Sequence, residues 1–195
     1  ILVWIPQSKD EQQKIANCLS SLDVVLSTET EKLDLLKDHK KGLLQQLFPA
    51  EGETQPKFRF PEFKNDGWST KILGSLAENL SNRRVPITSN KREKGNIPYY
   101  GATGVIDFVK DFIYDEELLL ISEDGANLLD RNYPIAFSIS GKTWVNNHAH
   151  VLKFLNKSTE ILVQQFINSK SVEEYLTGKA QPKLNRKNLE RIKIP

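Results

Sequence analysis

Several residue types that define particular classes of protein are scarce or missing from these 195 residues. Methionine is absent, and Cys18 is the single cysteine, so no disulfide framework can hold the chain together. Such low cysteine usage is typical of the reducing cytoplasm. No apolar run approaches the roughly 18 residues needed to cross a bilayer, and no signal-peptide pattern is present. We therefore expect a cytoplasmic protein with no membrane contact.

Net charge is also small. The 27 Lys and Arg residues are nearly balanced by 25 Asp and Glu, which leaves a formal charge of +2. No global field draws the chain to nucleic acid, so any basic surface must be local. The length allows one domain with an appendage or two small domains, and 38% hydrophobic residues can fill a core. Because the chain starts ILVWIP, like the interior of a strand, we expect a piece of a longer protein.

Histidine is scarce, yet two of the three histidines lie in AFSISGKTWVNNHAH, residues 136–150. On a strand, His148 and His150 would share one face. Since only His39 and Cys18 remain elsewhere, a metal site lacks an obvious third ligand, and packed or hydrogen-bonded histidines are the favoured interpretation. We expect no metal site and no cofactor. A third interpretation stays open, in which the polar side chains of this stretch contact nucleic acid and Trp144 offers a flat apolar platform.

The same stretch fits the permissive phosphate-loop pattern A-x-x-x-x-G-K-T at residues 136–143. Such a loop follows a strand, bends through glycines and opens a helix whose amides hold the phosphates. Only Gly141 is available here, and Trp144-Val145 followed by two asparagines favours a strand or a turn. A nucleotide site is therefore disfavoured.

One long helix is predicted over residues 8–48. Ser8 and Glu11 form a capping-box pattern, and Pro49 ends the helix. Its apolar residues recur with an average period of 3.5, interrupted only by Glu29 and Lys40, which is typical of a coiled-coil seam. The alternative is an amphipathic helix that lies on its own domain. The seam consists of Ile15, Leu19, Leu22, Leu26, Leu33, Leu36, Leu43 and Leu47.

Beyond a Pro- and Gly-rich linker, the pattern changes to short elements. Strands are predicted at 117–122, 134–140 and 148–155, with a hairpin turn at 123–125. Helices are predicted at 74–80, at 158–170 with Ser158 as its cap, and at 171–176. This mixture without regular alternation predicts an α+β fold: a coiled-coil-type helix over 1–49, followed by a mixed globular domain over 50–195. The ending RIKIP echoes LVWIP at residues 2–6.

These stretches resemble, in order, the DNA-specificity subunit of type I restriction–modification enzymes. The stretches that carry the resemblance include IPQSKDEQQKIANCLSSLD (5–23), FRFPEF (58–63), LLISEDGANLL (119–129), SGKTWVNNHAHVLK (140–153) and GKAQPKLNRKNLERIKIP (178–195). The resemblance implies two target-recognition domains joined by two antiparallel helices, each domain reading one half of a split DNA site. It also implies that modification and restriction subunits carry the catalytic sites. This chain then corresponds to one helix and one recognition domain, with no catalytic residue of its own.

The implied partners are double-stranded DNA, methyltransferase subunits and, through them, restriction subunits. Two basic clusters could contact phosphates, and Arg or Asn side chains could read bases. The candidate DNA-binding residues are Arg83, Arg84, Lys91, Arg92, Lys94, Lys142, Asn146, Asn147, His148, Lys179 and Lys183. The alternative function is a coiled-coil assembly module that binds protein partners without reading bases.

The seam also predicts an antiparallel homodimer of this chain, because an uncovered apolar stripe seeks a second copy. One symmetric register places Glu29 opposite Lys40 of the partner. Every other facing pair is then Leu on Leu: Leu33 with Leu36, Leu26 with Leu43, and Leu22 with Leu47. The two polar interruptions thus meet with opposite charge, and polar seam residues are known to fix register.

Overall fold

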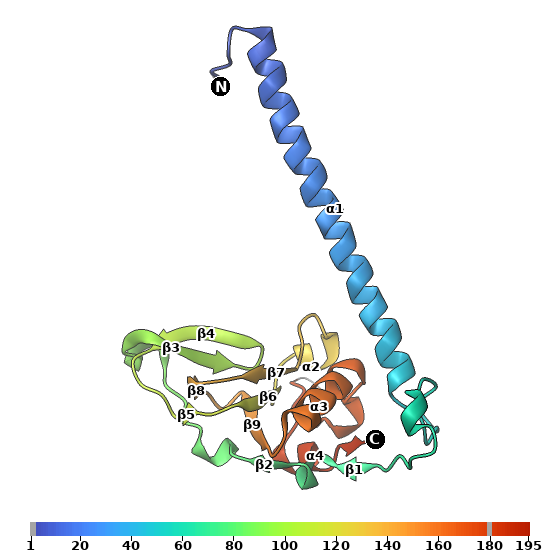
Figure 1. Cartoon of the computed structure of the whole chain (residues 1–195). Coiled ribbons are helices and arrows are strands. Elements are labelled where there is room, and N and C mark those ends of the chain that lie inside the picture. The colour runs from blue at the N-terminus through green and yellow to red at the C-terminus, as the bar shows by residue number, and fades with distance from the viewer. Residues whose placement is uncertain (1–2, 179–180) are drawn as a thin grey trace. The chain divides into compact units, whose positions relative to one another are not determined.

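The computed structural model describes residues 3–178 and 181–195. The chain forms two compact units that divide between Leu43 and Leu44. Figure 1 follows the elements from the first helix to the C-terminus. In the part of the chain that the structure describes, no helix combines the length and the apolar character needed to cross a membrane.

Helix α1 (Lys9–Leu47) confirms the long helix expected from the heptad pattern. Its 39 residues correspond to a length of about 58 Å. The Ser8 hydroxyl accepts a hydrogen bond from the Glu11 amide at 3.4 Å, which satisfies one of the free amides of the first turn. No residue of α1 is buried, and the apolar seam is exposed from Ile15 to Leu43, whereas Leu47 at its end is half-buried.

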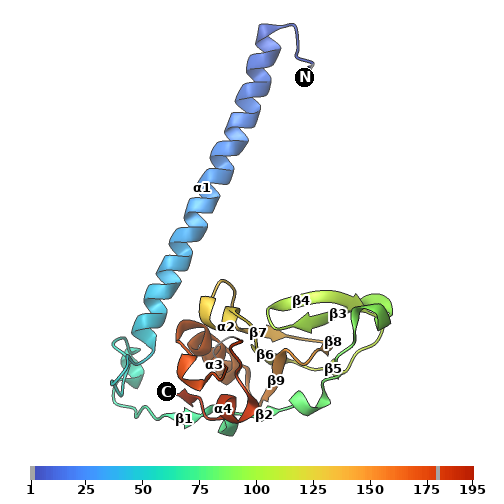
Figure 2. The same ribbon diagram turned by 180° about the vertical axis from the view of Figure 1, so that it is seen from behind.

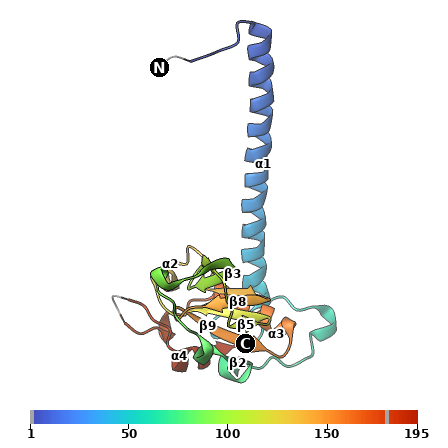
Figure 3. The same cartoon turned by 90° about the vertical axis from the view of Figure 1, so that its left-hand side faces the viewer.

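The second unit contains two four-stranded sheets. The central sheet has the order β2 (Ala77–Asn79), β9 (Ala149–Phe154), β6 (Leu118–Ser122) and β7 (Ala136–Ile139), all antiparallel. The outer sheet has the order β4 (Gly104–Val109), β3 (Lys94–Gly101), β8 (Lys142–Val145) and β5 (Tyr114–Asp115). Within it, β3 and β8 run parallel, whereas the other pairs are antiparallel. Figure 2 shows β3, β4, β5 and β8 grouped at one side of this unit, and in Figure 3 that side faces the viewer.

The remaining elements are short apart from one helix. Helix α3 (Lys157–Ser169) packs on β7 and β9, and β1 (Lys71–Ile72) pairs antiparallel with β10 (Lys193–Ile194). The other elements are the helices α2 (Asn127–Asp130) and α4 (Arg186–Glu190) and the 3-10 turns η1 (Pro61–Phe63), η2 (Leu73–Ser75), η3 (Ser81–Arg83), η4 (Ser89–Lys91) and η5 (Glu173–Tyr175).

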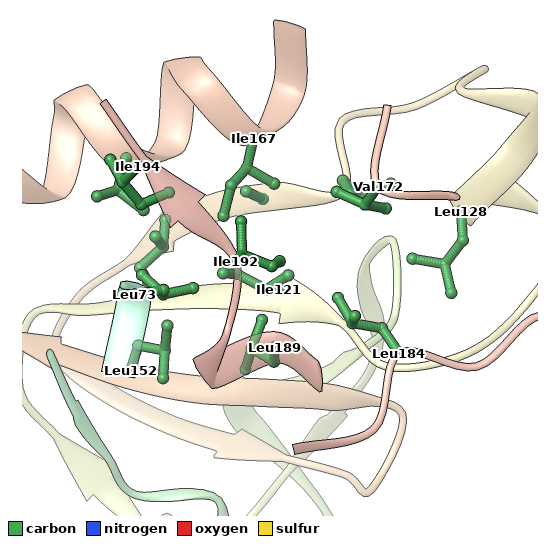
Figure 4. Packing of buried hydrophobic residues seen from close by; sticks show 14 residues of the cluster. Leu73, Ile121, Leu128, Leu152, Ile167, Val172, Leu184, Leu189, Ile192 and Ile194 are labelled. Carbon is green, nitrogen blue, oxygen red and sulfur yellow. The ribbon is translucent and has the colours of Figure 1, made fainter. Parts of the chain in front are cut away.

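Strand β6 is buried on both faces because it lies between two hydrophobic clusters. Leu119 and Ile121 point into a cluster with residues of α3, α4 and β10, part of which Figure 4 shows. Leu118 and Leu120, on the opposite face, meet Tyr114 and other residues of the outer sheet and of β7 to β9. A continuous apolar run such as LLLI is therefore what a fully covered central strand requires.

Four local predictions are corrected by the structure. Residues 74–80 form a 3-10 turn and strand β2 instead of a helix, because pairing with β9 satisfies their backbone. Helix α3 starts one residue earlier, and the side chain of Asn156 caps it by accepting from the Thr159 amide. Residues 171–176 make only the single turn η5. Residues 123–125 are not a hairpin turn, because α2 intervenes before β7.

Strand β6 supplies a stability test. Leu119→Ala should lower the free energy of unfolding by about 2–5 kcal/mol, because Leu119 is fully buried and its truncation leaves a cavity. Leu155→Ala is the matched control, since that leucine is fully exposed and should change stability by less than about 0.5 kcal/mol. Urea unfolding followed by circular dichroism measures both. Equal losses in the two variants would contradict the central placement of β6.

Candidate nucleic-acid interface

The parallel pairing of β3 with β8 brings four loops to one edge of the second unit. The carboxyl ends of the two strands meet there, and the Asn146 amide donates to the Tyr100 carbonyl at 3.0 Å. The Ser122 hydroxyl donates to the Ala102 carbonyl at 2.6 Å. The backbone of Glu123 joins two further loops to this edge. Its amide donates to the His148 carbonyl at 2.8 Å, and its carbonyl accepts from the amide of residue 184 at 2.7 Å. We call residues 101–104, 122–125, 146–148 and 181–184 the loop edge.

A largely buried carboxylate, that of Glu123, lies at the centre of the loop edge. Glu123 accepts a hydrogen bond from Arg84 at 2.6 Å and pairs with Lys183 at 3.2 Å. Burial alone raises the pKa of the Glu123 carboxyl, but the hydrogen bonds and positive charges around it outweigh that effect and leave the pKa below its usual value. Glu123 is therefore ionised at neutral pH, and its charge holds Arg84 in place.

The sequence predicts Arg84 as a residue that reads bases, but the structure gives its side chain a different position. The guanidinium also donates to the carbonyls of Ala149 at 2.7 Å and Ser81 at 2.8 Å, and only 14% of the side chain is exposed. Every described contact is made within the protein, so Arg84 ties η3 to the loop edge. Sequence reasoning missed Glu123 as its partner, although an acidic residue directly after a buried strand is a usable signal.

The two histidines of this region have separate environments. His150 is buried, and its Nε2 lies 2.7 Å from the Leu184 carbonyl, so this nitrogen carries the proton and donates. Burial lowers the pKa of His150 more than the Leu184 carbonyl and Glu123 raise it. His148 is half exposed, and its Nδ1 lies 2.8 Å from a carboxylate oxygen of Asp124. Among the described residues, no three His, Cys, Asp or Glu side chains are grouped to hold a metal ion.

The two asparagines that precede His148 also differ. The side chain of Asn146 is buried and accepts from the His148 amide at 2.8 Å, which fixes the turn between β8 and β9. Asn147 is exposed beside it. Asn147 and His148, like Lys183, are therefore predicted polar side chains that the loop edge presents to solvent, whereas the Asn146 side chain bonds to the backbone.

The remaining predicted arginines are fixed to the outer sheet. Arg83 pairs with Glu116 at 2.9 Å and lies over the Tyr114 ring, 4.8 Å from its centre. Arg92 pairs with Asp107 at 3.0 Å and lies over the Tyr99 ring at 4.5 Å. The Arg92 hydrogen bond lowers the pKa of the Asp107 carboxyl. Both arginines thus hold the segment after β2 against the sheet.

The predicted lysines divide into paired and unpaired groups. Lys91, Lys94 and Lys142 are exposed and make no ion pair within the described residues. The Lys142 ammonium lies 4.8 Å from the centre of the Phe112 ring. Lys183 pairs with Glu123, and Lys179 lies outside the described residues.

The structure also settles the phosphate-loop pattern. Gly141, with a φ of 70°, forms the turn between β7 and β8, and Lys142 begins a strand. A strand, not a helix N-terminus, therefore follows this turn. Trp144 does not offer a free platform, because its indole donates to the Val85 carbonyl at 2.6 Å and its side chain is half buried.

The second unit is thus a two-sheet scaffold that presents polar loops at one edge, and a long exposed helix precedes it. Comparison with known proteins gives the family. The family model for the type I restriction modification DNA specificity domain matches residues 65–195, and the chain belongs to this family.

Two curated relatives agree with this assignment, and one solved structure shares the fold. A protein of Haemophilus influenzae named as a type I restriction enzyme specificity subunit is 37% identical over 125 residues, which cover 64% of this chain and 32% of the relative. The MjaX specificity subunit of Methanocaldococcus jannaschii is 26% identical over 95% of this chain and 46% of its own length. The crystal structure of the S subunit from M. genitalium has a TM-score of 0.69 at 19% identity, covering 96% of this chain and 49% of that one. This chain therefore spans between a third and half of the length of these relatives.

The ion pair between Arg84 and Glu123 can be tested by comparing substitutions of Arg84 and its neighbour Arg83. Arg84→Ala leaves the Glu123 carboxylate buried with its main partner removed, and should lower the free energy of unfolding by about 3–5 kcal/mol. Arg83→Ala removes a more exposed pair and should cost about 1 kcal/mol or less. Chemical denaturation at pH 7 measures both variants. The assignment of Arg84 as the structural residue is wrong if Arg83→Ala proves the more destabilising of the two.

Proposed function

We propose that this chain binds double-stranded DNA through the loop edge and reads one half of a bipartite site for a type I restriction–modification complex. The observation that carries the proposal is the convergence of four loops on a rigid, ion-paired centre, with Asn147 and His148 exposed at its surface. Groups that read base edges must be held in fixed positions, because specificity comes from paired hydrogen bonds.

We expect the unpaired lysines to contact phosphates and the loop edge to contact bases. Lys94 and Lys142 begin β3 and β8, whose carboxyl ends form the loop edge. The eight residues of β3 span about 26 Å, less than the roughly 34 Å of one DNA turn. A duplex on this side of the outer sheet can therefore meet the lysines with its phosphates and the loop edge with a groove.

The exposed seam of α1 supports the second part of the proposal. A helix whose apolar seam has no cover within the described residues is suited to pair with another helix and to dock the methyltransferase subunits. In this chain we expect the seam to form the antiparallel homodimer with Glu29 opposite Lys40. Assembly through protein partners without DNA contact is the competing function, and the salt dependence of DNA binding separates the two.

Replacing the three unpaired lysines should weaken DNA binding without changing its sequence preference. For Lys91→Gln, Lys94→Gln and Lys142→Gln combined, the slope of log affinity against log salt should fall by about 0.9 for each contacted phosphate. Fluorescence anisotropy with mixed-sequence duplexes measures this slope. The matched control replaces three other exposed lysines, Lys57, Lys64 and Lys71, and should keep the slope of the unchanged chain. Identical slopes in all three proteins would rule out this cluster as the phosphate contact.

Reversing one seam charge should weaken the homodimer, and reversing both should restore it. Glu29→Lys creates two Lys–Lys contacts per dimer and should raise the dissociation constant about tenfold, which is about 1.4 kcal/mol. Its local pair with Lys32, at 3.4 Å, is exposed and contributes little. Glu29→Lys with Lys40→Glu should recover the original constant, measured by sedimentation equilibrium.

The control for this pair is Glu31→Lys, which makes the same charge change at an exposed position outside the seam. It should leave the dissociation constant within about twofold of the original. Failure of the second substitution to rescue the first would show that residues 29 and 40 do not face each other.

A further inference from the structure

His148 and Asp124 form a hydrogen-bonded pair at the surface of the loop edge. The Nδ1 atom of His148 lies 2.8 Å from one carboxylate oxygen of Asp124 and 3.0 Å from the other. Both side chains remain accessible, since 51% of His148 and 31% of Asp124 are exposed. The pair therefore belongs to the folded surface and is still open to a ligand.

The backbone holds both partners in place. The His148 amide donates to the Asn146 side chain at 2.8 Å, and the His148 carbonyl accepts from the Glu123 amide, also at 2.8 Å. Asp124 follows directly after Glu123 and forms an antiparallel bridge with Lys183. The imidazole ring is thus positioned by its own backbone on one side and by the Asp124 carboxylate on the other. A group that recognises a ligand specifically requires this kind of support.

The same geometry determines which ring nitrogen is available. A carboxylate oxygen only accepts hydrogen bonds, so Nδ1 of His148 carries a proton in both charge states of the ring. Among the described residues, the hydrogen bonds of the ring are made by Nδ1 alone. Nε2 accepts a hydrogen bond when the ring is neutral and donates one when the ring is protonated. Protonation therefore decides what His148 can bind, without moving the ring.

A DNA duplex at the loop edge favours the protonated ring, because its phosphates bring negative charge. The protein groups around the ring are already paired: Lys183 and Arg84 bond to Glu123 at 3.2 and 2.6 Å, and residues 101–104 carry no charged side chain. Burial lowers the pKa of His150, so that ring takes up its proton at a lower pH than an accessible histidine does. His148 is the group of the loop edge that can gain a proton as DNA binds.

Of the four bases, guanine matches a protonated Nε2 best. The major-groove edge of guanine has two adjacent acceptors, N7 and O6. Adenine places an amino donor beside its N7, thymine places a methyl group beside its acceptor, and cytosine offers a donor. A charged donor gains most from the edge that has two acceptors and no competing donor.

We propose that His148, protonated and oriented by Asp124, reads a guanine of the half-site by donating a hydrogen bond from Nε2 to the guanine N7. This role rests on the proposed function and names one base that the loop edge recognises. His148 is then a specificity-determining residue and Asp124 is its positioning residue. Because the complex holds one more proton than the free chain, specific binding weakens as the pH rises.

The test combines pH with a base analogue. Duplexes that the chain selects from a random-sequence pool at about pH 6 supply the half-site, and fluorescence anisotropy measures their affinity between about pH 6 and pH 8. The unchanged chain should lose up to about tenfold in affinity per pH unit, the limit for uptake of one proton. Replacing one guanine by 7-deazaguanine, which lacks N7, should cost about tenfold at the lower pH and remove the pH dependence.

Substitutions assign the proton and the contact to this pair. His148→Gln keeps an amide donor near the position of Nε2, so it should retain the guanine preference without the pH dependence, whereas His148→Ala should lose both. Asp124→Ala should weaken selective binding about tenfold, and Asp124→Asn, whose carbonyl oxygen still accepts from Nδ1, should restore it. The control is His39→Gln, at an exposed position on α1, which should keep the affinity and the pH dependence of the unchanged chain.

Several results would overturn this role of His148 and leave the proposed function in place. They are selective binding that does not change with pH, pH dependence that survives in His148→Gln, pH dependence that no 7-deazaguanine removes, and a selected half-site without guanine. A chain that selects no sequence, or binds no DNA, overturns the proposed function as well. Circular dichroism spectra that match the unchanged chain show that each variant is folded.

Discussion

The loop edge of the second unit depends on one largely buried charge, the carboxylate of Glu123, whose side chain is 12% exposed. A carboxylate removed from water is stable only when hydrogen bonds and opposite charges replace its hydration. Arg84 from η3 and Lys183 from the C-terminal segment meet this requirement, while the backbone on both sides of Glu123 bonds to the turn after β8 and to residue 184. Four stretches that are far apart in the chain are thereby held at one edge.

Arginine and lysine look alike as cations in the sequence, but the structure uses them differently. The arginines at 83, 84 and 92 are used inside the protein, on carboxylates, carbonyls and tyrosine rings. The lysines at 91, 94 and 142 remain free of ion pairs within the described chain. A planar guanidinium can satisfy several acceptors at once, whereas an ammonium on a flexible stem stays hydrated and available for a phosphate.

Much of the architecture could be predicted because its signals are local. The 3.5-residue repeat indicated α1, and short apolar runs indicated β6, β7 and β9. The candidate site was harder to predict, because the partner of Arg84 lies 39 residues away and the partner of Arg83 lies 33 residues away. The prediction for residues 74–80 was wrong for a related reason: pairing with β9 decides their conformation, and their own helix propensity does not. The cap of α3 is Asn156 and not Ser158. Both residue types are good helix caps, so the sequence alone did not distinguish them.

The parallel pairing of β3 with β8 also requires two distant segments of the chain to meet. The paired residues Tyr99 and Trp144 are separated by 45 positions, so closing that loop has a larger entropic cost than forming the hairpins β3–β4 or β6–β7. Contacts between distant segments form slowly unless local structure already brings them together. The loop edge needs this long-range pairing, so it cannot form from local hairpins alone. Pairing of β2 with β9 joins Ala77 to Phe154, 77 positions apart, and has a larger closure cost still.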